Sequence, residues 1–153
     1  MVDQFDINPR NLCFEITEGA AITNVDHADG FMAALGARGC RFALDDFGVG
    51  MSSLTYLRRL PISYLKIDGS FVKDLSTDPV NRAMVQAIQT VASTAQVKTV
   101  AESVEVAADL AVLKDIGIDL IQGYLIAKPM RMEELCRLDF TELNAATYDT
   151  AAR

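Results

Sequence analysis

Acidic side chains end several short apolar runs in this sequence, at positions where they could bind metal ions. Glu15, Asp45, Asp68 and Glu102 each end such a run, and Lys66 lies in one of them. Carboxylates that lie close together repel one another unless protons or metal ions neutralise them. A fold has no structural need for four unpaired acids in one place. The pattern therefore predicts a metal-dependent site, provided that the fold brings these acids together.

Each apolar run is followed by a loop and a helical pattern, which indicates alternating strands and helices. We expect strands near residues 12–17, 41–45, 64–68, 98–102 and 120–123. This alternation predicts an α/β fold with a parallel sheet and right-handed crossovers, whose carboxyl strand ends meet at one edge. Because strand side chains alternate between faces, we expect Phe14, Leu44, Leu65 and Ile67 on one face and Glu15, Asp45, Lys66 and Asp68 on the other.

Helical periodicity predicts which side chains cover the sheet. A first helix is expected from about residue 24 to residue 38, with Phe31 and Met32 toward the sheet. The clearest helix starts with Asp78 as its N-cap and Pro79 in its first turn. The apolar stripe of that helix is predicted to consist of Val80, Met84, Ile88 and Val91.

Composition limits the class of protein. The chain has 153 residues, 50% of them apolar, and a formal net charge of −7. This length is typical of one domain, which we place at residues 1–140, followed by a frayed tail at 141–153. The negative charge argues against a nucleic-acid polymer as partner. Three cysteines without disulfide or zinc spacing indicate a reduced, cytoplasmic protein, and no apolar run approaches the roughly 20 residues that span a membrane.

Five strands are too few for a closed barrel. A complete (β/α)₈ barrel typically needs about 250 residues. The chain is therefore either a small open α/β fold or the later part of a barrel whose beginning is missing.

Six motifs that follow one another along the chain favour the second possibility. They are Phe14–Glu18, Ala43–Leu54, Leu57–Pro61, Leu65–Val72, Val100–Glu105 and Gln122–Leu125. Together they resemble the EAL family of bacterial cyclic-di-GMP phosphodiesterases, over about residues 11–130. The resemblance implies a TIM-type barrel with one reversed strand, of which this chain supplies the last five βα units. It also implies hydrolysis of cyclic-di-GMP to linear pGpG.

The resemblance assigns most of the acids to two divalent ions, Mg²⁺ or Mn²⁺. Glu15 and Asp45 match ligands of the first ion, and Asp45 would bridge to the second. Asp46 matches a ligand of the second ion, with Glu102 and Asp68 in its shell or holding its waters. Two oxygen-ligated ions about 4 Å apart supply a nucleophile and neutralise phosphoryl charge. Carboxylates suit hard ions of this kind, and no His/Cys cluster is present to select zinc.

Further matches assign catalytic and supporting roles. Lys66 matches the lysine that orients or deprotonates the attacking water, acting together with Glu102. Two nearby cations would lower the pKa of this lysine. Gln122 matches a residue that contacts a water or an ion. Glu105 would lie next to the ligands without contacting the ions.

A loop over residues 47–53 resembles the segment through which this family couples dimerisation to activity. Glu18 resembles the glutamate that pins this loop, which includes Ser52 and Ser53. Val49 replaces the usual threonine and Met51 the usual aromatic residue. The tethering of the loop is therefore in doubt.

Several other departures from the family concern catalysis. The Glu-Ala-Leu segment is absent from this chain, together with its glutamate ligand, a phosphate-holding arginine and an asparagine ligand. Ser103 replaces a glycine, and Ala127 replaces the usual serine or glycine. We therefore expect negligible hydrolysis by this chain alone. The alternative is a non-catalytic, degenerate EAL module that binds a nucleotide or a protein.

The site residues also have structural alternatives, namely a turn for Asp45-Asp46, a helix cap for Glu102 and Glu105, and an ion pair for Lys66 and Asp68.

An arc of five strands would expose two sheet edges and an apolar inner face. The inner face is predicted around Cys13, Ala43, Val100 and Leu120. We expect either a homodimer that covers these surfaces or dependence on the missing amino-terminal half of the domain.

Overall fold

A computed structural model describes residues 6–23, 25–49, 57 and 59–138. Its centre is a parallel sheet with the order β1-β2-β3-β4-β5. The strands are β1 (Cys13–Thr17), β2 (Arg41–Phe47), β3 (Tyr64–Ile67), β4 (Lys98–Ala101) and β5 (Leu120–Ile121). Each strand therefore pairs with the next one in the sequence, as the barrel implied by the family resemblance requires.

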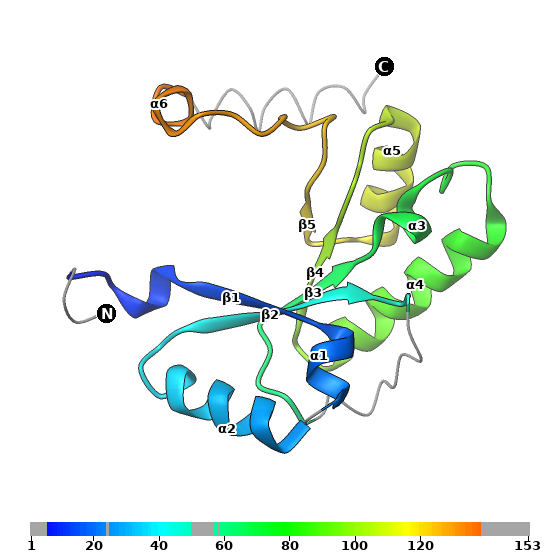
Figure 1. Ribbon diagram of the computed structural model, residues 1–153. Coiled ribbons are helices and arrows are strands. Elements are labelled where there is room, and N and C mark those ends of the chain that lie inside the picture. Colours follow the sequence, from blue (N-terminus) through cyan, green and yellow to red (C-terminus); the bar gives the residue numbers. More distant parts are fainter. Residues whose placement is uncertain (1–5, 24, 50–56, 58, 139–153) are drawn as a thin grey trace.

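Helices cover one face of this sheet (Figure 1). A 3₁₀ turn, Pro9–Asn11, precedes β1. The α-helices are α1 (Glu18–Thr23), α2 (Val25–Gly36), α3 (Gly69–Val72), α4 (Pro79–Thr94), α5 (Ala107–Ile116) and α6 (Met132–Leu135). The other face is open between β1 and the segment that leads from β5 to α6 (Figure 1). Within the described residues, no helix is long and apolar enough to cross a membrane.

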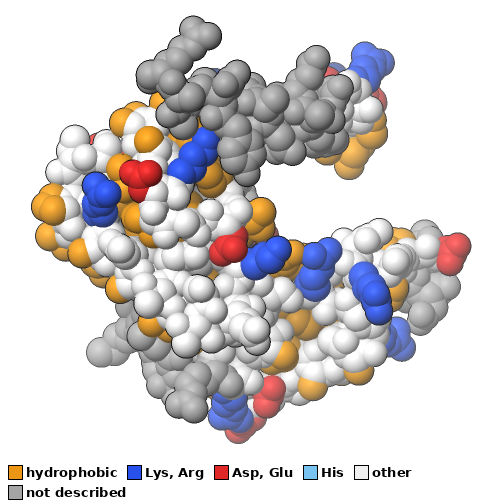
Figure 2. Space-filling model, turned by 180° about the vertical axis from the view of Figure 1, so that it is seen from behind, with side chains coloured by type: hydrophobic (Ala, Val, Ile, Leu, Met, Phe, Trp, Pro, Cys, Tyr) orange, Lys and Arg blue, Asp and Glu red, His pale blue; other side chains and the backbone are white. Residues whose placement is uncertain are grey.

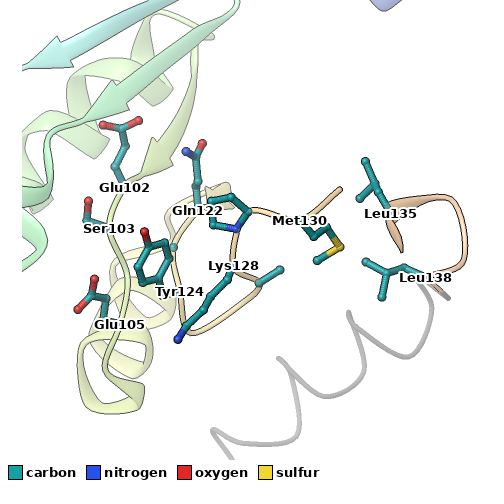
Figure 3. Close-up of a pocket in the computed structure, with 12 residues that line it drawn as sticks. Glu102, Ser103, Glu105, Gln122, Tyr124, Lys128, Met130, Leu135 and Leu138 are labelled. Atoms are coloured by element: carbon teal, nitrogen blue, oxygen red, sulfur yellow. The ribbon is translucent and has the colours of Figure 1, made fainter. Parts of the chain in front are cut away.

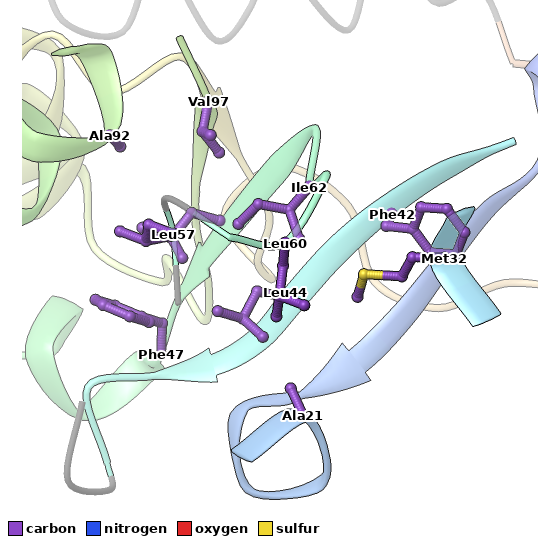
Figure 4. Packing of buried hydrophobic residues seen from close by; sticks show 11 residues of the cluster. Ala21, Met32, Phe42, Leu44, Phe47, Leu57, Leu60, Ile62, Ala92 and Val97 are labelled. Atoms are coloured by element: carbon purple, nitrogen blue, oxygen red, sulfur yellow. The ribbon is translucent and has the colours of Figure 1, made fainter. Parts of the chain in front are cut away.

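Two clusters of buried side chains fill the space between the sheet and the helices. In the first, Phe42 and Leu44 of β2 and Leu65 of β3 pack with Met32 of α2 (Figure 4). The second consists of Ile67, Val72, Leu75, Val85, Ala101, Val104, Leu110 and Leu113. The predicted apolar set of Leu44, Leu65 and Ile67 is thus confirmed on the helix-covered face.

Helix α4 begins as predicted but turns a different side to the core. Asp78 caps it by accepting hydrogen bonds from the backbone N–H groups of Val80 at 2.8 Å and Asn81 at 3.2 Å. However, Val80 and Met84 are 65% and 42% exposed, so the predicted stripe is wrong in the first half of the helix. Val85 and Ala92 are buried instead. Apolar residues occur on two adjacent sides of this helix, and packing against the sheet selects one of them.

The first predicted helix is confirmed as α2, which runs from Val25 to Gly36. A short helix that was not predicted, α1, precedes it at residues 18–23. Met32 is fully buried as predicted. Phe31 also faces the sheet as predicted: although it is 42% exposed, its ring lies 6.1 Å from that of Phe14 on β1 and 6.2 Å from that of Phe42 on β2. The predicted tail, 141–153, lies outside the described residues.

The open face carries the predicted apolar interior only in part. Cys13 and Leu120 are exposed, and Val100 is half-buried. Ala43, in contrast, is buried. It lies in register between Glu15 and Tyr64, whose longer side chains flank its methyl group. Figure 2, viewed from behind, shows a hollow beside this part of the molecule, with apolar side chains on part of its wall.

Candidate functional site

A bulge at the end of β2 brings two consecutive acids to one place. The pairing of β2 with β3 shifts in register between Leu44 and Phe47, and Asp46 has a left-handed φ of 56°. In a regular strand Asp45 and Asp46 would face opposite sides of the sheet. Bulges re-aim side chains in this way. As a result, carboxylate oxygens of Asp45, Asp46 and Glu102 all lie within 4.8 Å of one another.

Lys66 lies among three of the predicted acids. Its Nζ donates a hydrogen bond to Glu15 Oε2 at 3.0 Å. The same Nζ lies 2.8 Å from Asp45 Oδ1 and 2.7 Å from Glu102 Oε1. The expectation of four unpaired acids is therefore wrong, because the buried ammonium group of one lysine pairs with three of them.

The protonation of Lys66 follows from these contacts. Burial by itself lowers the pKa of the ammonium group, but the carboxylates of Asp45, Glu102 and Glu15 outweigh burial and raise the pKa above the ordinary lysine value. We expected two nearby cations to lower the pKa of Lys66. The protein groups alone do the opposite and raise it. In this arrangement Lys66 is a proton donor and a counter-ion.

The chemistry of the acids fits a hard divalent ion. Asp45 Oδ1 is buried and lies 2.8 Å from Lys66 Nζ, so the cation beside this oxygen is the ammonium group of the lysine. The fit to a metal ion therefore depends on the oxygen atoms that the acids offer together. Asp45, Asp46 and Glu102 together offer only oxygen ligands, which Mg²⁺ and Mn²⁺ prefer.

Asp68 has a different place from the one expected for a metal ligand. Its side chain caps the short helix α3 and accepts a hydrogen bond from the backbone N–H of Ser70 at 2.9 Å. It does not join the group of Asp45, Asp46 and Glu102 among the described residues. A direct role for Asp68 at an ion stays a prediction.

The start of the predicted regulatory loop is held by Glu18. This side chain is buried at the start of α1, and its Oε2 accepts a hydrogen bond from the backbone N–H of Gly48 at 3.3 Å. Ser52 and Ser53 lie outside the described residues. The predicted link between Glu18 and this loop is therefore seen at Gly48.

A cavity of about 680 Å³ opens beside the acids. Gln122 and Glu105 line it together with Glu102, as Figure 3 shows. Tyr124 and Lys128 also line it, and Lys128 Nζ lies 5.7 Å from the ring centre of Tyr124. The sequence analysis gave neither residue a role, although Tyr124 lies within the Gln122–Leu125 motif and Lys128 comes three residues after it. The aromatic ring of Tyr124 and the ammonium group of Lys128 together suit a planar, anionic ligand.

Ser103 lines both this cavity and a second one of about 540 Å³. Its φ is 55°, a left-handed value that favours glycine. The Ser103 side chain occupies the space over Gly69, where an added Cβ would lie 2.7 Å from it. The substitution of Ser103 for glycine therefore adds strain and a hydroxyl group next to Glu102.

Residues 1–129 of this chain match a family model described as "EAL domain". Over 139 residues the chain is 43% identical to the cyclic di-GMP phosphodiesterase PdeB of Shewanella oneidensis, covering 91% of this chain and 16% of that protein. The chain thus spans about a sixth of this curated relative.

Solved structures are similar over most of the chain. The PaMucR phosphodiesterase of Pseudomonas aeruginosa in complex with c-di-GMP superimposes with a TM-score of 0.83 at 39% identity, covering 88% of this chain and 54% of that one. BlrP1 of Klebsiella pneumoniae, in a manganese and cyclic-di-GMP complex, gives a TM-score of 0.77 at 31% identity, covering 81% of this chain and 32% of that one. The fold is therefore the last five βα units of a TIM-type barrel, and within this chain the barrel is incomplete.

Proposed function

This chain belongs to the EAL domain family, and we propose that it forms the carboxy-terminal part of a domain that hydrolyses cyclic-di-GMP to linear pGpG. The observation that carries the proposal is the convergence of Asp45, Asp46 and Glu102, two of which, Asp45 and Glu102, also contact Lys66. The substrate is inferred from relatives whose names include this nucleotide. A cytoplasmic location is part of the same proposal.

Divalent ions held by Asp45, Asp46 and Glu102 would activate a water and neutralise charge on the phosphoryl oxygens. Glu15 contributes through its contact with Lys66 Nζ or as a further ligand. Lys66 holds a proton at Nζ beside the acids, where it can orient an attacking water or exchange a proton with it. Gln122 and Glu105 line the adjoining cavity and position the ligand's polar groups.

The cavity supports a dinucleotide ligand. It lies next to the acids, and its wall combines the carboxylate of Glu105, the ring of Tyr124 and the ammonium group of Lys128. An aromatic ring and a cation suit a base and a phosphate, respectively. The chain by itself lacks the Glu-Ala-Leu segment, so we expect negligible turnover from it alone and full activity only from a complete domain.

A non-catalytic EAL module is the second candidate. The observation in its favour is that Lys66 already pairs with Glu15, Asp45 and Glu102, so that a protein cation occupies the space between these acids and offsets part of their charge. In that case the domain would bind a nucleotide or a protein without using ions. For either function, we propose that a second copy or the amino-terminal part of the domain covers the two open sheet edges.

Binding of Mn²⁺ separates the two candidates. We would titrate the chain with Mn²⁺ and follow the free ion by electron paramagnetic resonance. The variant Asp46→Asn is the informative one, because asparagine tolerates the left-handed backbone at this position. We expect it to weaken binding by about 10-fold or more.

Asp115→Asn is the matched control, since Asp115 is an exposed acid on α5. It should bind Mn²⁺ as the unaltered chain does. Absence of Mn²⁺ binding, or equal affinity in all three proteins, would contradict the ion-dependent function and favour the non-catalytic module.

A further inference from the structure

The turn that follows Asp46 adopts an unusual backbone. Asp46 and Gly48 have φ values of 56° and 109°, and the N–H of Val49 lies 3.5 Å from the carbonyl oxygen of Asp46. A left-handed backbone is unfavourable for a residue other than glycine, because its Cβ lies too close to the following carbonyl oxygen. Such a conformation persists only where surrounding contacts impose it. The contacts that hold residues 46–49 therefore decide where the Asp46 carboxylate lies.

The ring of Phe71 makes one of these contacts. A Cβ atom built at Gly48 would overlap Phe71 Cε2 and would lie 3.0 Å from its Cζ and 3.2 Å from its Cδ2. The ring therefore lies flush against the backbone of Gly48. Phe71 belongs to α3 and packs on the core cluster that includes Ile67 and Val72. The contact thus connects the turn to the rigid interior.

Two hydrogen bonds hold the same turn from other directions. The carboxylate of Glu18 accepts from the N–H of Gly48 at 3.3 Å, and the N–H of Asp68 lies 3.4 Å from the carbonyl oxygen of Phe47. Both distances are long for hydrogen bonds. The packing of the Phe71 ring on the Gly48 backbone therefore adds to two long hydrogen bonds in holding this turn.

We propose that Phe71 is a positioning residue for Asp46, which keeps the Asp46 carboxylate close to those of Asp45 and Glu102 by pressing on Gly48. The inference rests on the proposed function, in which these three acids hold a divalent ion. Mg²⁺ in particular demands near-ideal ligand geometry, so a small relaxation of this turn weakens ion binding. Nothing in the role requires Phe71 to touch the ion or the substrate.

The test uses Phe71→Ala and Phe71→Leu in the full 153-residue chain, with Mn²⁺ alone as the probe. Phe71→Ala is expected to weaken Mn²⁺ binding about 10-fold, the range seen when a group that orients a metal ligand is lost. Phe71→Leu keeps part of the apolar contact and should have an intermediate effect. Phe31→Ala is the matched control, because Phe31 lies on α2 and packs with Phe14 and Phe42 rather than with the turn.

Hydrogen exchange followed by mass spectrometry supplies the second measurement. Phe71→Ala should speed exchange in peptides that contain residues 46–49, with no comparable change in peptides from α2. Phe31→Ala should speed exchange in peptides from α2, with no comparable change in peptides that contain residues 46–49. Unchanged exchange at 46–49 in Phe71→Ala would overturn the inference, because the ring would not hold the turn.

Ion binding and exchange together distinguish the possible failures. Faster exchange at 46–49 with unchanged Mn²⁺ affinity would overturn the inference while leaving the proposed function intact. Absence of Mn²⁺ binding by the unaltered chain would contradict both. A loss of Mn²⁺ affinity that is equal in Phe71→Ala and Phe31→Ala would also overturn the inference, since it would reflect general destabilisation.

Discussion

The two faces of the sheet differ in the kind of contact that their side chains make. On the helix-covered face, Leu44, Leu65 and Ile67 are fully buried and pack with helices, so that any side chain of suitable size and polarity contributes to stability. On the open face, Lys66 contacts Glu15, Asp45 and Glu102 at distances between 2.7 and 3.0 Å. Each of those contacts depends on one atom of one residue. The first face therefore tolerates repacking, whereas the second depends on exact positions.

The largest effect that this comparison predicts is on stability. Leu65→Ala removes a fully buried side chain from the helix-covered face and should lower the unfolding free energy by about 2–5 kcal/mol. Leu120→Ala makes the same change on the open face, where the side chain is 44% exposed, and should cost less than about 1 kcal/mol. Urea unfolding at one fixed protein concentration measures both. Equal losses would mean that the open face is packed as tightly as the other.

The next effect concerns hydrolysis in a complete domain that contains this chain. Asp45→Asn, Glu15→Gln and Lys66→Ala should each lower cyclic-di-GMP turnover by at least about 100-fold, the scale for loss of a positioned catalytic group. Chromatographic measurement of pGpG provides the rates, with Asp115→Asn as the control. Near-normal turnover in Asp45→Asn would show that the open face does not carry out the chemistry proposed for it.

Association of the chain is a further test of the open face. β1 and β5 form the two ends of the sheet, and Cys13 and Leu120 on them are exposed. Unpaired strand edges recruit other strands. We therefore expect light scattering to show a dimer or larger assembly rather than a monomer. A uniform monomer with a cooperative thermal transition would contradict this prediction.

The smallest expected effect is a dependence on alkaline pH. Folding raises the pKa of Lys66, so its ion pairs stabilise the fold fully below the ordinary lysine pKa of about 10.4. Above that value the unfolded chain loses the proton while the folded chain keeps it, and stability falls as pH rises. The difference in unfolding free energy between the unaltered chain and Lys66→Met should therefore be constant from about pH 7 to 10 and shrink at higher pH. A change below pH 9 would contradict this assignment.

Alternation along the strands was sufficient to predict the faces of the sheet. It placed Leu65 and Ile67 toward the helices and Lys66 on the opposite face, and the family motifs predicted the incomplete barrel correctly. Alternation could not predict the bulge at Asp46, because it assumes a regular strand. The only signal was an acid pair two residues before Gly48, which also suits an ordinary turn.

Contacts between side chains of distant strands could not be predicted from the sequence, for a different reason. Asp45 lies on β2 and Glu102 directly follows β4, the two strands that flank β3, but Glu15 comes from β1, two strands away. Whether the Glu15 carboxylate reaches Lys66 depends on the register of two strand pairs and on a flexible side chain. In the same way, the buried side of α4 depends on its packing partners, since Val80 and Val85 are equally apolar.

The sequential strand order has a consequence for how this protein folds. Because each strand pairs with its neighbour in the chain, no pairing has to close a loop longer than a single crossover. Loop-closure entropy grows with loop length, and topologies with local contacts fold faster than those with distant ones. The chain can therefore fold progressively during its synthesis, as each new strand docks on the one before it. Every intermediate on that route presents a free strand edge for the next strand to join.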